Sequence, residues 1–228
     1  MVETWRINLA QFEFAQAHCL RLLDLHEQAT AVKFKRPDLY RRYVLVHGLL
    51  RLILANYLAI PAQAITIKRT EFGKPYLPDY PEFNFNISHS GLTLLIAVTR
   101  ETAVGVDIEW IKPRSSLAGL VQRCCSEREA RYWDSLPEVQ QVKLFYQFWT
   151  RKEAFVKAVG RGIALGLSEV ELNLERDGYF LALPAGCGLC EDWRVVDIIT
   201  ETDLQGALVI AGTESIVQSR NITDLQLF

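Results

Sequence analysis

Two short segments of the chain place acidic and basic side chains at spacings that suit phosphate chemistry. In the first, Asp107 and Glu109 alternate with apolar residues, so a β-strand would present both carboxylates on one face. In the second, Glu153 and Lys157 are four residues apart, which places them on one face of a helix. Carboxylates are the oxygen ligands that Mg²⁺ prefers, and the lysine adds a positive charge. Together the two segments predict a metal site that handles phosphate groups.

Each segment also has a simpler interpretation. An acidic pair in a strand is often a solvated edge, and a Glu–Lys pair four residues apart often only supports its own helix. A third segment favours function. Residues 85–91, Phe-Asn-Ile-Ser-His-Ser-Gly, follow a Gly-Lys-Pro-Tyr turn at 73–76. Ser88 and His89 there lie in a polar break between apolar runs, where hydroxyl, imidazole and backbone N–H groups can bind an anion.

The elements that position these residues follow from local patterns. Apolar stripes predict helices over 12–28, 38–58 and 137–159, the last ended by glycines. Capping boxes at Ser126 and Ser135 begin a short helix and the second long helix. Alternating or apolar segments bounded by turn residues predict strands at 5–9, 65–67, 83–87, 93–99, 104–110, 170–174, 179–183, 193–199 and 207–211.

The order of these elements repeats weakly along the chain. A long helix, an alternating strand, a glycine turn and further strands occur twice. This order predicts an α+β fold of two similar lobes, each with a long helix packed on a mostly antiparallel sheet. We place the N-terminal lobe at 1–104 and the C-terminal lobe at 105–228, so that the acidic strand and the Glu153 helix belong to the second lobe.

Composition excludes several classes of protein. A net charge of −2 argues against nucleic acid as a partner, because binding a phosphate backbone requires a basic surface. The apolar stretch at 44–60 is interrupted by His47, Arg51 and Asn56, which predicts a buried helix and no membrane span. The first residues show no signal peptide. We therefore expect a cytoplasmic protein that does not bind membranes.

The five cysteines do not indicate a disulfide framework in a chain of 228 residues. Cys187 and Cys190 have the spacing of a redox motif or of half a zinc site. No second pair or nearby histidine completes four ligands, so reduced thiols without a chemical role are the favoured interpretation.

Four motifs in order, GKPYL, FNISHSG, GVDIEW and FWTRKEAFVKAVGRG, closely resemble the 4'-phosphopantetheinyl transferases of the long, two-lobed Sfp type. The resemblance extends from about residue 34 to residue 162 and more loosely over both ends. It implies two lobes related by a pseudo-twofold axis, with coenzyme A bound in the cleft between them. It also implies that the phosphopantetheine arm of coenzyme A is transferred to a serine of an apo acyl or peptidyl carrier protein, releasing adenosine 3',5'-bisphosphate.

The resemblance assigns roles to the acidic and basic residues. Asp107, Glu109 and Glu153 match the carboxylates that hold Mg²⁺ against the pyrophosphate of coenzyme A. Glu153 is also the candidate general base for the carrier serine, directly or through a water molecule. Lys157 matches a lysine that contacts phosphate and would stabilise the departing bisphosphate.

Further residues match positions that bind coenzyme A. Ser88 and His89 match contacts to the pyrophosphate, Lys74 matches a basic contact near the adenosine, and Arg42 matches a position lining the adenine and ribose pocket. The chain departs from the family near residue 27. Some relatives carry lysines for the 3'-phosphate there, whereas this chain has Glu27 and Thr30, and the candidates to replace them are Lys33, Lys35 and Arg36.

Two other functional classes stay open. A non-catalytic coenzyme A-binding module would have lost a metal carboxylate, and a metal-dependent phosphodiesterase or nuclease would show a basic groove. All three carboxylates are present, and Lys and Arg are in local excess only at residues 33–36 and 41–42, so the transferase is preferred. Two lobes on one chain would complete the site, so we expect a monomer. The carrier, from fatty acid, polyketide or peptide synthesis, stays open.

Overall fold

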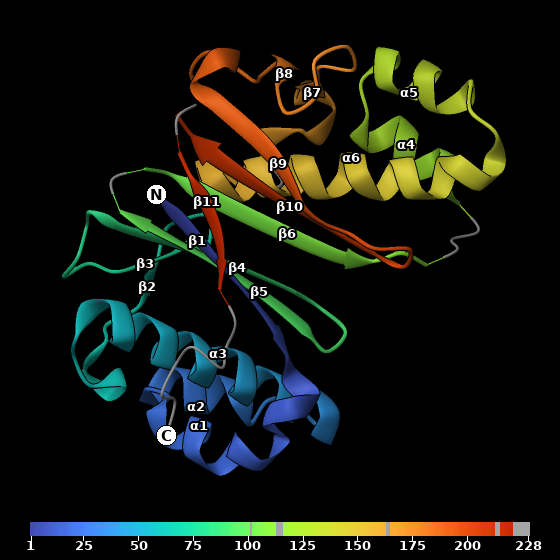
Figure 1. Cartoon of the computed structure of the whole chain (residues 1–228). Helices are drawn as coiled ribbons and strands as arrows, with labels where there is room; N and C mark the ends of the chain where they lie inside the picture. The colour runs from blue at the N-terminus through green and yellow to red at the C-terminus, as the bar shows by residue number, and fades with distance from the viewer. Residues whose placement is uncertain (101, 113–115, 163–164, 213–214, 221–228) are drawn as a thin grey trace.

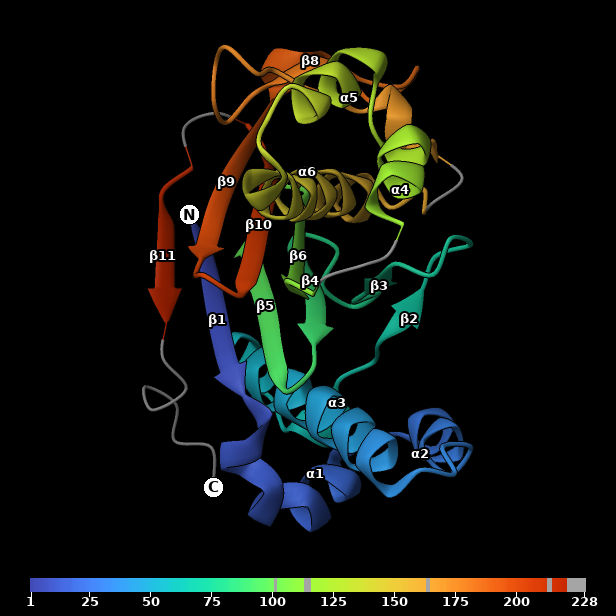
Figure 2. The ribbon, with the colours of Figure 1, turned by 90° about the vertical axis from the view of Figure 1, so that its right-hand side faces the viewer.

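The computed structural model describes residues 1–100, 102–112, 116–162, 165–212 and 215–220. Its fold is α+β, as the sequence predicts, and the larger sheets are mostly antiparallel. Two such sheets pack partly against each other through their inner faces, and helices cover the outer face of each (Figures 1 and 2).

The first sheet has the order β11-β1-β5-β4. It consists of β1 (Val2–Asn8), β4 (Phe83–Ser90), β5 (Thr93–Arg100) and β11 (Val217–Arg220), and β11 is the one strand that pairs in parallel, with β1. The helix α3 (Pro37–Leu58) packs on it, with α1 (Gln16–Leu22) and α2 (Leu25–Ala31) beneath α3. Alternate residues of the strands, including Ile7, Phe85 and Ile96, form one core with the α3 residues Leu49 and Ile53.

The second sheet has the order β6-β10-β9, all antiparallel. Its strands are β6 (Val104–Trp110), β9 (Trp193–Thr200) and β10 (Leu204–Ala211). The helix α6 (Glu138–Val159) lies along one face, and α4 (Leu117–Cys124), α5 (Glu127–Asp134) and the hairpin of β7 (Glu171–Leu172) and β8 (Phe180–Ala182) pack around it. The opposite face buries Val106, Ile108 and Leu208 against Leu95 and Ala97 of the first sheet.

A small hairpin extends from the first sheet toward α6. It consists of β2 (Lys68–Arg69) and β3 (Pro75–Tyr76), joined by a turn in which Gly73 has a positive φ of 84°. This conformation favours glycine because it has no Cβ. The hairpin carries Lys74 next to the C-terminal end of α6.

Several local predictions are confirmed and others are wrong. The long helices and the strands of both large sheets other than β11 are present near their predicted bounds, and the Ser126 capping box forms. The strand β11 was not predicted. The Ser135 capping box does not, because Pro137 takes the N-cap position of α6 and the Ser135 hydroxyl donates to Tyr132 O at 2.7 Å. The strand predicted at 65–67 is also wrong, since pairing begins only at Lys68.

The helix predicted over residues 12–28 is broken into three pieces. A 3-10 helix at Leu9–Ala15 is followed by α1 and α2, and Asp24 caps α2. Asp24 and Glu27 form a capping box, each side chain bonding the other residue's backbone N–H, and Leu23 before it is extended. The apolar pattern that predicted one helix over residues 12–28 therefore continues across the turn between α1 and α2.

None of the helices in the described ranges combines the length and the apolar composition needed to cross a bilayer. The division of the chain at residue 104 and the similarity of the two lobes stay predictions.

Candidate active site

The face of β6 that carries the acidic residues is the face toward α6. A Cβ on Gly105 would lie 2.0 Å from Ala154 O and 2.4 Å from Ala158 N of α6, so no side chain fits there. The glycine lets the helix approach the strand directly. Because strand side chains alternate, Asp107 and Glu109 share the Gly105 face. The one-turn spacing of Glu153 and Lys157 then brings both beside this acidic strand.

Asp107 is the centre of the cluster. Lys157 Nζ lies 2.6 Å from Asp107 Oδ1 and 3.0 Å from Ser88 Oγ, and the Ser88 hydroxyl donates to the same Oδ1 at 2.8 Å. Asp107 is only 4% exposed, and its second oxygen, Oδ2, is buried without a hydrogen-bond partner among the described residues. One oxygen of this carboxylate is saturated, and the other remains to accept a ligand.

The other two carboxylates lie within electrostatic range of Asp107. Burial and the negative charges of Asp107 and Glu109 raise the pKa of Glu153, and the positive charge of Lys157 offsets part of this rise. The Ser90 hydroxyl donates to Glu109 Oε2 at 2.9 Å. A cation placed among the three carboxylates would relieve their repulsion.

The donor set suits a hard divalent cation. In the described part of the chain, no three His, Cys, Asp or Glu side chains are grouped closely enough to hold a metal ion as they stand, and the Lys157 ammonium rests on Asp107. Even so, the unpartnered Oδ2 of Asp107 and the mutual repulsion felt by Glu153 are features that a bound cation would satisfy. Oxygen ligands alone, with room for water and phosphate, fit Mg²⁺.

Two cavities adjoin the cluster, and a third lies next to them. The largest, about 540 Å³, is lined by Ser88, His89 and all three carboxylates together with Lys157. A second of about 240 Å³ shares Glu153 and Lys157 and is lined by Lys74 and two glycines after α6. A third, about 300 Å³, lies between α2, α3 and the small hairpin. The structure thus gathers the predicted residues from β4, β6, α6 and the hairpin around adjoining spaces.

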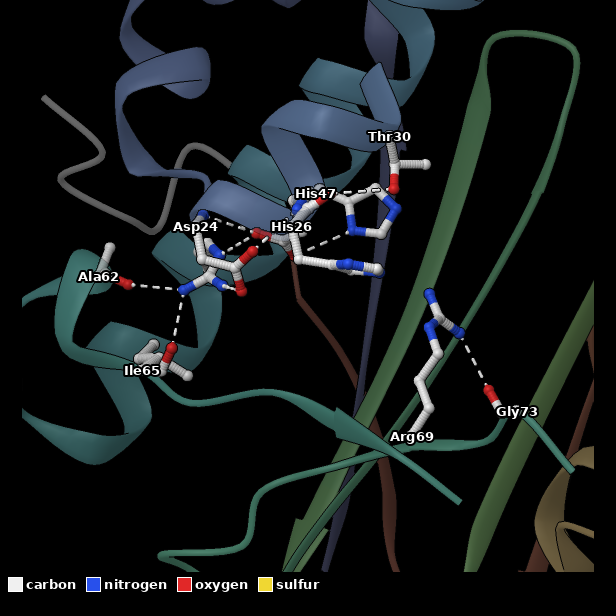
Figure 3. A network of polar contacts seen from close by, with 10 residues as sticks. Asp24, His26, Thr30, His47, Ala62, Ile65, Arg69 and Gly73 are labelled. Carbon is white, nitrogen blue, oxygen red and sulfur yellow. Dashed lines mark hydrogen bonds and ion pairs between the residues drawn. The ribbon is translucent and has the colours of Figure 1, made fainter. Parts of the chain in front are cut away.

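Arg69 lines all three cavities and was not identified from the sequence. Its guanidinium donates to Gly73 O at 2.9 Å (Figure 3). The sequence could have identified Arg69 as a site residue, because it precedes the Gly73–Lys74 turn by a few residues and a hairpin brings the two ends of such a turn together. Its position makes it a further candidate for contacting phosphate.

The remaining predicted residues differ in setting. Burial lowers the pKa of Lys74 to about 8, and its ammonium donates to Ala158 O at 2.6 Å. His89 is exposed on the largest cavity; partial loss of water and the positive charges of Arg42 and Lys157 lower its pKa. Arg42 lies on α3, half-buried, and is not among the residues that line the three cavities.

Glu27, where the chain is expected to depart from some members of the family, has a structural role. Its carboxylate accepts from Arg51 Nε at 2.7 Å and lies 3.2 Å from His47 Nδ1. Burial alone would raise the pKa of Glu27, but His47 and Arg51 lower it overall. Arg51 is fully buried and also bonds Asp24, Ala62 O and Ile65 O (Figure 3). Glu27 therefore balances a buried arginine.

The possible replacements for the missing lysines lie outside this network. Lys33 and Lys35 are exposed, and Arg36 pairs with Asp38 at 2.7 Å. Thr30 donates from its hydroxyl to His26 O at 3.0 Å (Figure 3).

Comparison with known proteins identifies the family. The model of the 4'-phosphopantetheinyl transferase superfamily matches residues 103–211, and that of the N-terminal part of a 4'-phosphopantetheinyl transferase matches residues 3–101. The 4'-phosphopantetheinyl transferase HetI of Nostoc sp. is 34% identical over 214 residues, which cover 92% of this chain and 88% of that protein. The 4'-phosphopantetheinyl transferase Sfp of Bacillus subtilis is 32% identical over 146 residues, 64% of each chain. The chain therefore belongs to the 4'-phosphopantetheinyl transferase superfamily and is an enzyme of that family.

Proposed function

We propose that the enzyme transfers 4'-phosphopantetheine from coenzyme A to a serine of an apo acyl or peptidyl carrier protein, with Mg²⁺ held by Asp107, Glu109 and Glu153. The observation that carries this proposal is the buried, unpartnered Oδ2 of Asp107 in a cavity that the other two carboxylates and Lys157 also line. When bound, the metal neutralises charge on the pyrophosphate.

Side chains of the protein would accept the proton of the carrier serine and stabilise the negative charge on the leaving group. Glu153 takes the proton of the carrier serine, directly or through a water molecule. The serine oxygen then bonds the phosphorus next to the pantetheine arm, and the bond from that phosphorus to adenosine 3',5'-bisphosphate breaks. Lys157 stabilises the negative charge on the departing bisphosphate.

Coenzyme A would lie across the adjoining cavities. Ser88 and His89 contact the pyrophosphate, and Lys74 and Arg69 approach from the hairpin. Arg42 on α3 lines none of these cavities and would reach only a part of the ligand that extends beyond them. Mixed donors of this kind position a phosphorylated ligand, and phosphoryl transfer depends mainly on positioning and charge stabilisation.

We further propose the organisation in which this happens. Residues 1–104 form the lobe on the coenzyme A side and residues 105–228 the lobe that carries the metal ligands, with β11 crossing back to pair with β1 of the first lobe. One chain supplies every residue of the site, which supports a monomer. All five cysteines are free thiols, which supports the reducing environment of the cytoplasm.

The decisive experiment incubates the protein with coenzyme A, Mg²⁺ and an apo carrier protein and follows the carrier by mass spectrometry. A gain of one phosphopantetheine, lost when the metal is chelated, is the expected result. Coenzyme A binding without a change in carrier mass would indicate a binding module. Hydrolysis of coenzyme A without carrier modification would indicate a phosphodiesterase.

A further inference from the structure

The two large sheets meet at β4 and β6 without a backbone ladder between them. In the described ranges, β4 is an edge strand of one sheet and β6 an edge strand of the other. Both strands are antiparallel to neighbours of their own, and they lie beside each other along the boundary (Figures 1 and 2). The N–H groups on the outer edge of β6 therefore need partners other than a strand backbone.

Three side chains of β4 supply those partners. Asn86 Oδ1 accepts from Val106 N at 2.9 Å, Ser88 Oγ accepts from Ile108 N at 3.4 Å, and Ser90 Oγ accepts from Trp110 N at 3.1 Å. The three residues alternate along β4, so they share one face, and the three amides alternate along β6. Side chains of β4 thus take the place of backbone carbonyl groups as acceptors for the amides of β6, and they separate the backbones of the two strands.

Ser90 also donates a hydrogen bond, in addition to the one that its hydroxyl oxygen accepts from the edge of β6. Its single hydroxyl proton goes to Glu109 Oε2 at 2.9 Å, while its oxygen accepts from Trp110 N. The Trp110 indole in turn donates to Ser90 O at 3.0 Å. The donor and acceptor directions of the hydroxyl are therefore both fixed. Ser90 ties the carboxylate of Glu109 to the backbone of the neighbouring sheet.

We infer that Ser90 is a positioning residue that holds Glu109 in the orientation in which it ligates the metal. The inference rests on the proposed function, because it concerns the same carboxylates. Ser90 is not among the residues lining the largest cavity, so it acts through Glu109 and not on the substrate. Groups that hydrogen-bond metal-ligating carboxylates commonly change metal affinity ten- to a hundredfold when removed.

The test compares Ser90→Ala with Ser90→Thr, which keeps the hydroxyl and suits a strand. Asn84→Ala is the matched control, because Asn84 lies on the same face of β4 and its amide donates locally, to Glu82 O, among the described residues. Mn²⁺ is titrated into each protein in the presence of coenzyme A, and the dissociation constant is measured by electron paramagnetic resonance. Amide hydrogen exchange at Trp110 is followed in parallel.

Ser90→Ala is expected to weaken Mn²⁺ binding about ten- to a hundredfold and to speed exchange of the Trp110 amide. Ser90→Thr and Asn84→Ala should stay within about twofold of wild type on the same scale. If Ser90→Ala does not fold, Ser90→Cys takes its place, since a thiol keeps the shape but donates weakly.

Two other results would overturn the inference. Faster Trp110 exchange with unchanged Mn²⁺ affinity would mean that Ser90 only joins the sheets. Equal loss of affinity in Ser90→Thr would mean that the hydroxyl is not the group that matters. If the wild-type protein binds no Mn²⁺, the proposed metal site itself is refuted. That outcome differs from both results above, in which the wild type binds Mn²⁺.

Discussion

Lys157 is expected to stabilise the protein through Asp107 as well as serve the substrate. Its Nζ lies 2.6 Å from Asp107 Oδ1, and the two side chains are 29% and 6% exposed. In Lys157→Met the buried Asp107 carboxylate would keep the Ser88 hydroxyl but lose its positive partner. It would then face the negative charges of Glu109 and Glu153 without compensation.

The magnitude follows from the burial of the pair. Removing one partner of a fully buried ion pair costs about 3–5 kcal/mol, whereas an exposed pair contributes about 0–1 kcal/mol. Because Lys157 is nearly a third exposed, we expect Lys157→Met to lose about 2 kcal/mol. For a chain of this size that loss lowers the Tm by about 4–8 °C. A lysine that only supported its own helix through Glu153 would contribute at most about 0.5 kcal/mol.

A double-mutant cycle measures the coupling. Lys157→Met, Asp107→Asn and the double variant are unfolded in urea without metal or coenzyme A. Lys143→Met is the control, because Lys143 is an exposed lysine of the same helix and should change stability by less than about 0.5 kcal/mol. The double variant should be more stable than Lys157→Met, because it no longer buries an unpaired carboxylate.

The carrier-protein assay separates the two roles of Lys157. If Lys157 contacts the departing phosphate, Lys157→Met lowers the transfer rate by orders of magnitude at a temperature where the variant is fully folded. Additive stability changes in the cycle would refute the coupling to Asp107. An unaltered rate constant would refute contact with the substrate.

Three further predictions concern the metal, coenzyme A binding and the C-terminal core. Asp107→Ala should abolish transfer while the protein stays folded, because the substitution also removes repulsion on Glu153; near-normal turnover at limiting Mg²⁺ would refute the metal assignment. Lys74, with a pKa of about 8, should regain its proton when phosphate binds. Coenzyme A affinity should therefore fall as pH rises through 8 to 9. Calorimetry in buffers of different ionisation enthalpy should show proton uptake on binding at about pH 8.5. Lys74→Arg should flatten the pH dependence, and the absence of proton uptake in wild type would contradict the prediction. Lys152→Met should lower the free energy of unfolding in urea by about 3–5 kcal/mol, because the side chains of Lys152 and Glu129 are fully buried and 2.5 Å apart. A decrease of less than about 1 kcal/mol would show that the two charges are not coupled.

The pKa of Lys74 also affects stability, with a definite sign. Its value in the unfolded chain is the ordinary one near 10.5, above the folded value of about 8. Between these values the unfolded state binds more protons, so the contribution of Lys74 to stability improves as pH rises through that window. Below pH 8 both states carry the proton, and the cost of burying the charge is fully present. The half-buried position of Lys74 limits that cost.

Local features were predictable because they depend on neighbours in the chain. The apolar periods at 38–58 and 137–159 gave the long helices within a residue of α3 and α6. The alternation at 104–110 gave β6 at its observed bounds. The prediction that Asp107 and Glu109 share a face needs only the two-residue period of a strand. The break at residues 23–24 was missed because a capping position outweighed a continuing apolar pattern. The start of α6 was predicted, but Pro137 and not Ser135 takes its N-cap position.

The sequence by itself determined which side chains the enzyme has, the helices and strands that carry them, and the family to which the chain belongs. Only the tertiary structure decided which of these residues touch. Lys157 pairs with Asp107 and Ser88, far from it in sequence, because Gly105 admits α6 against β6. Likewise β11 pairs with β1 from the opposite end of the chain. Such contacts depend on how whole elements pack, and the spacing of residues along one element contains no information about the element opposite it.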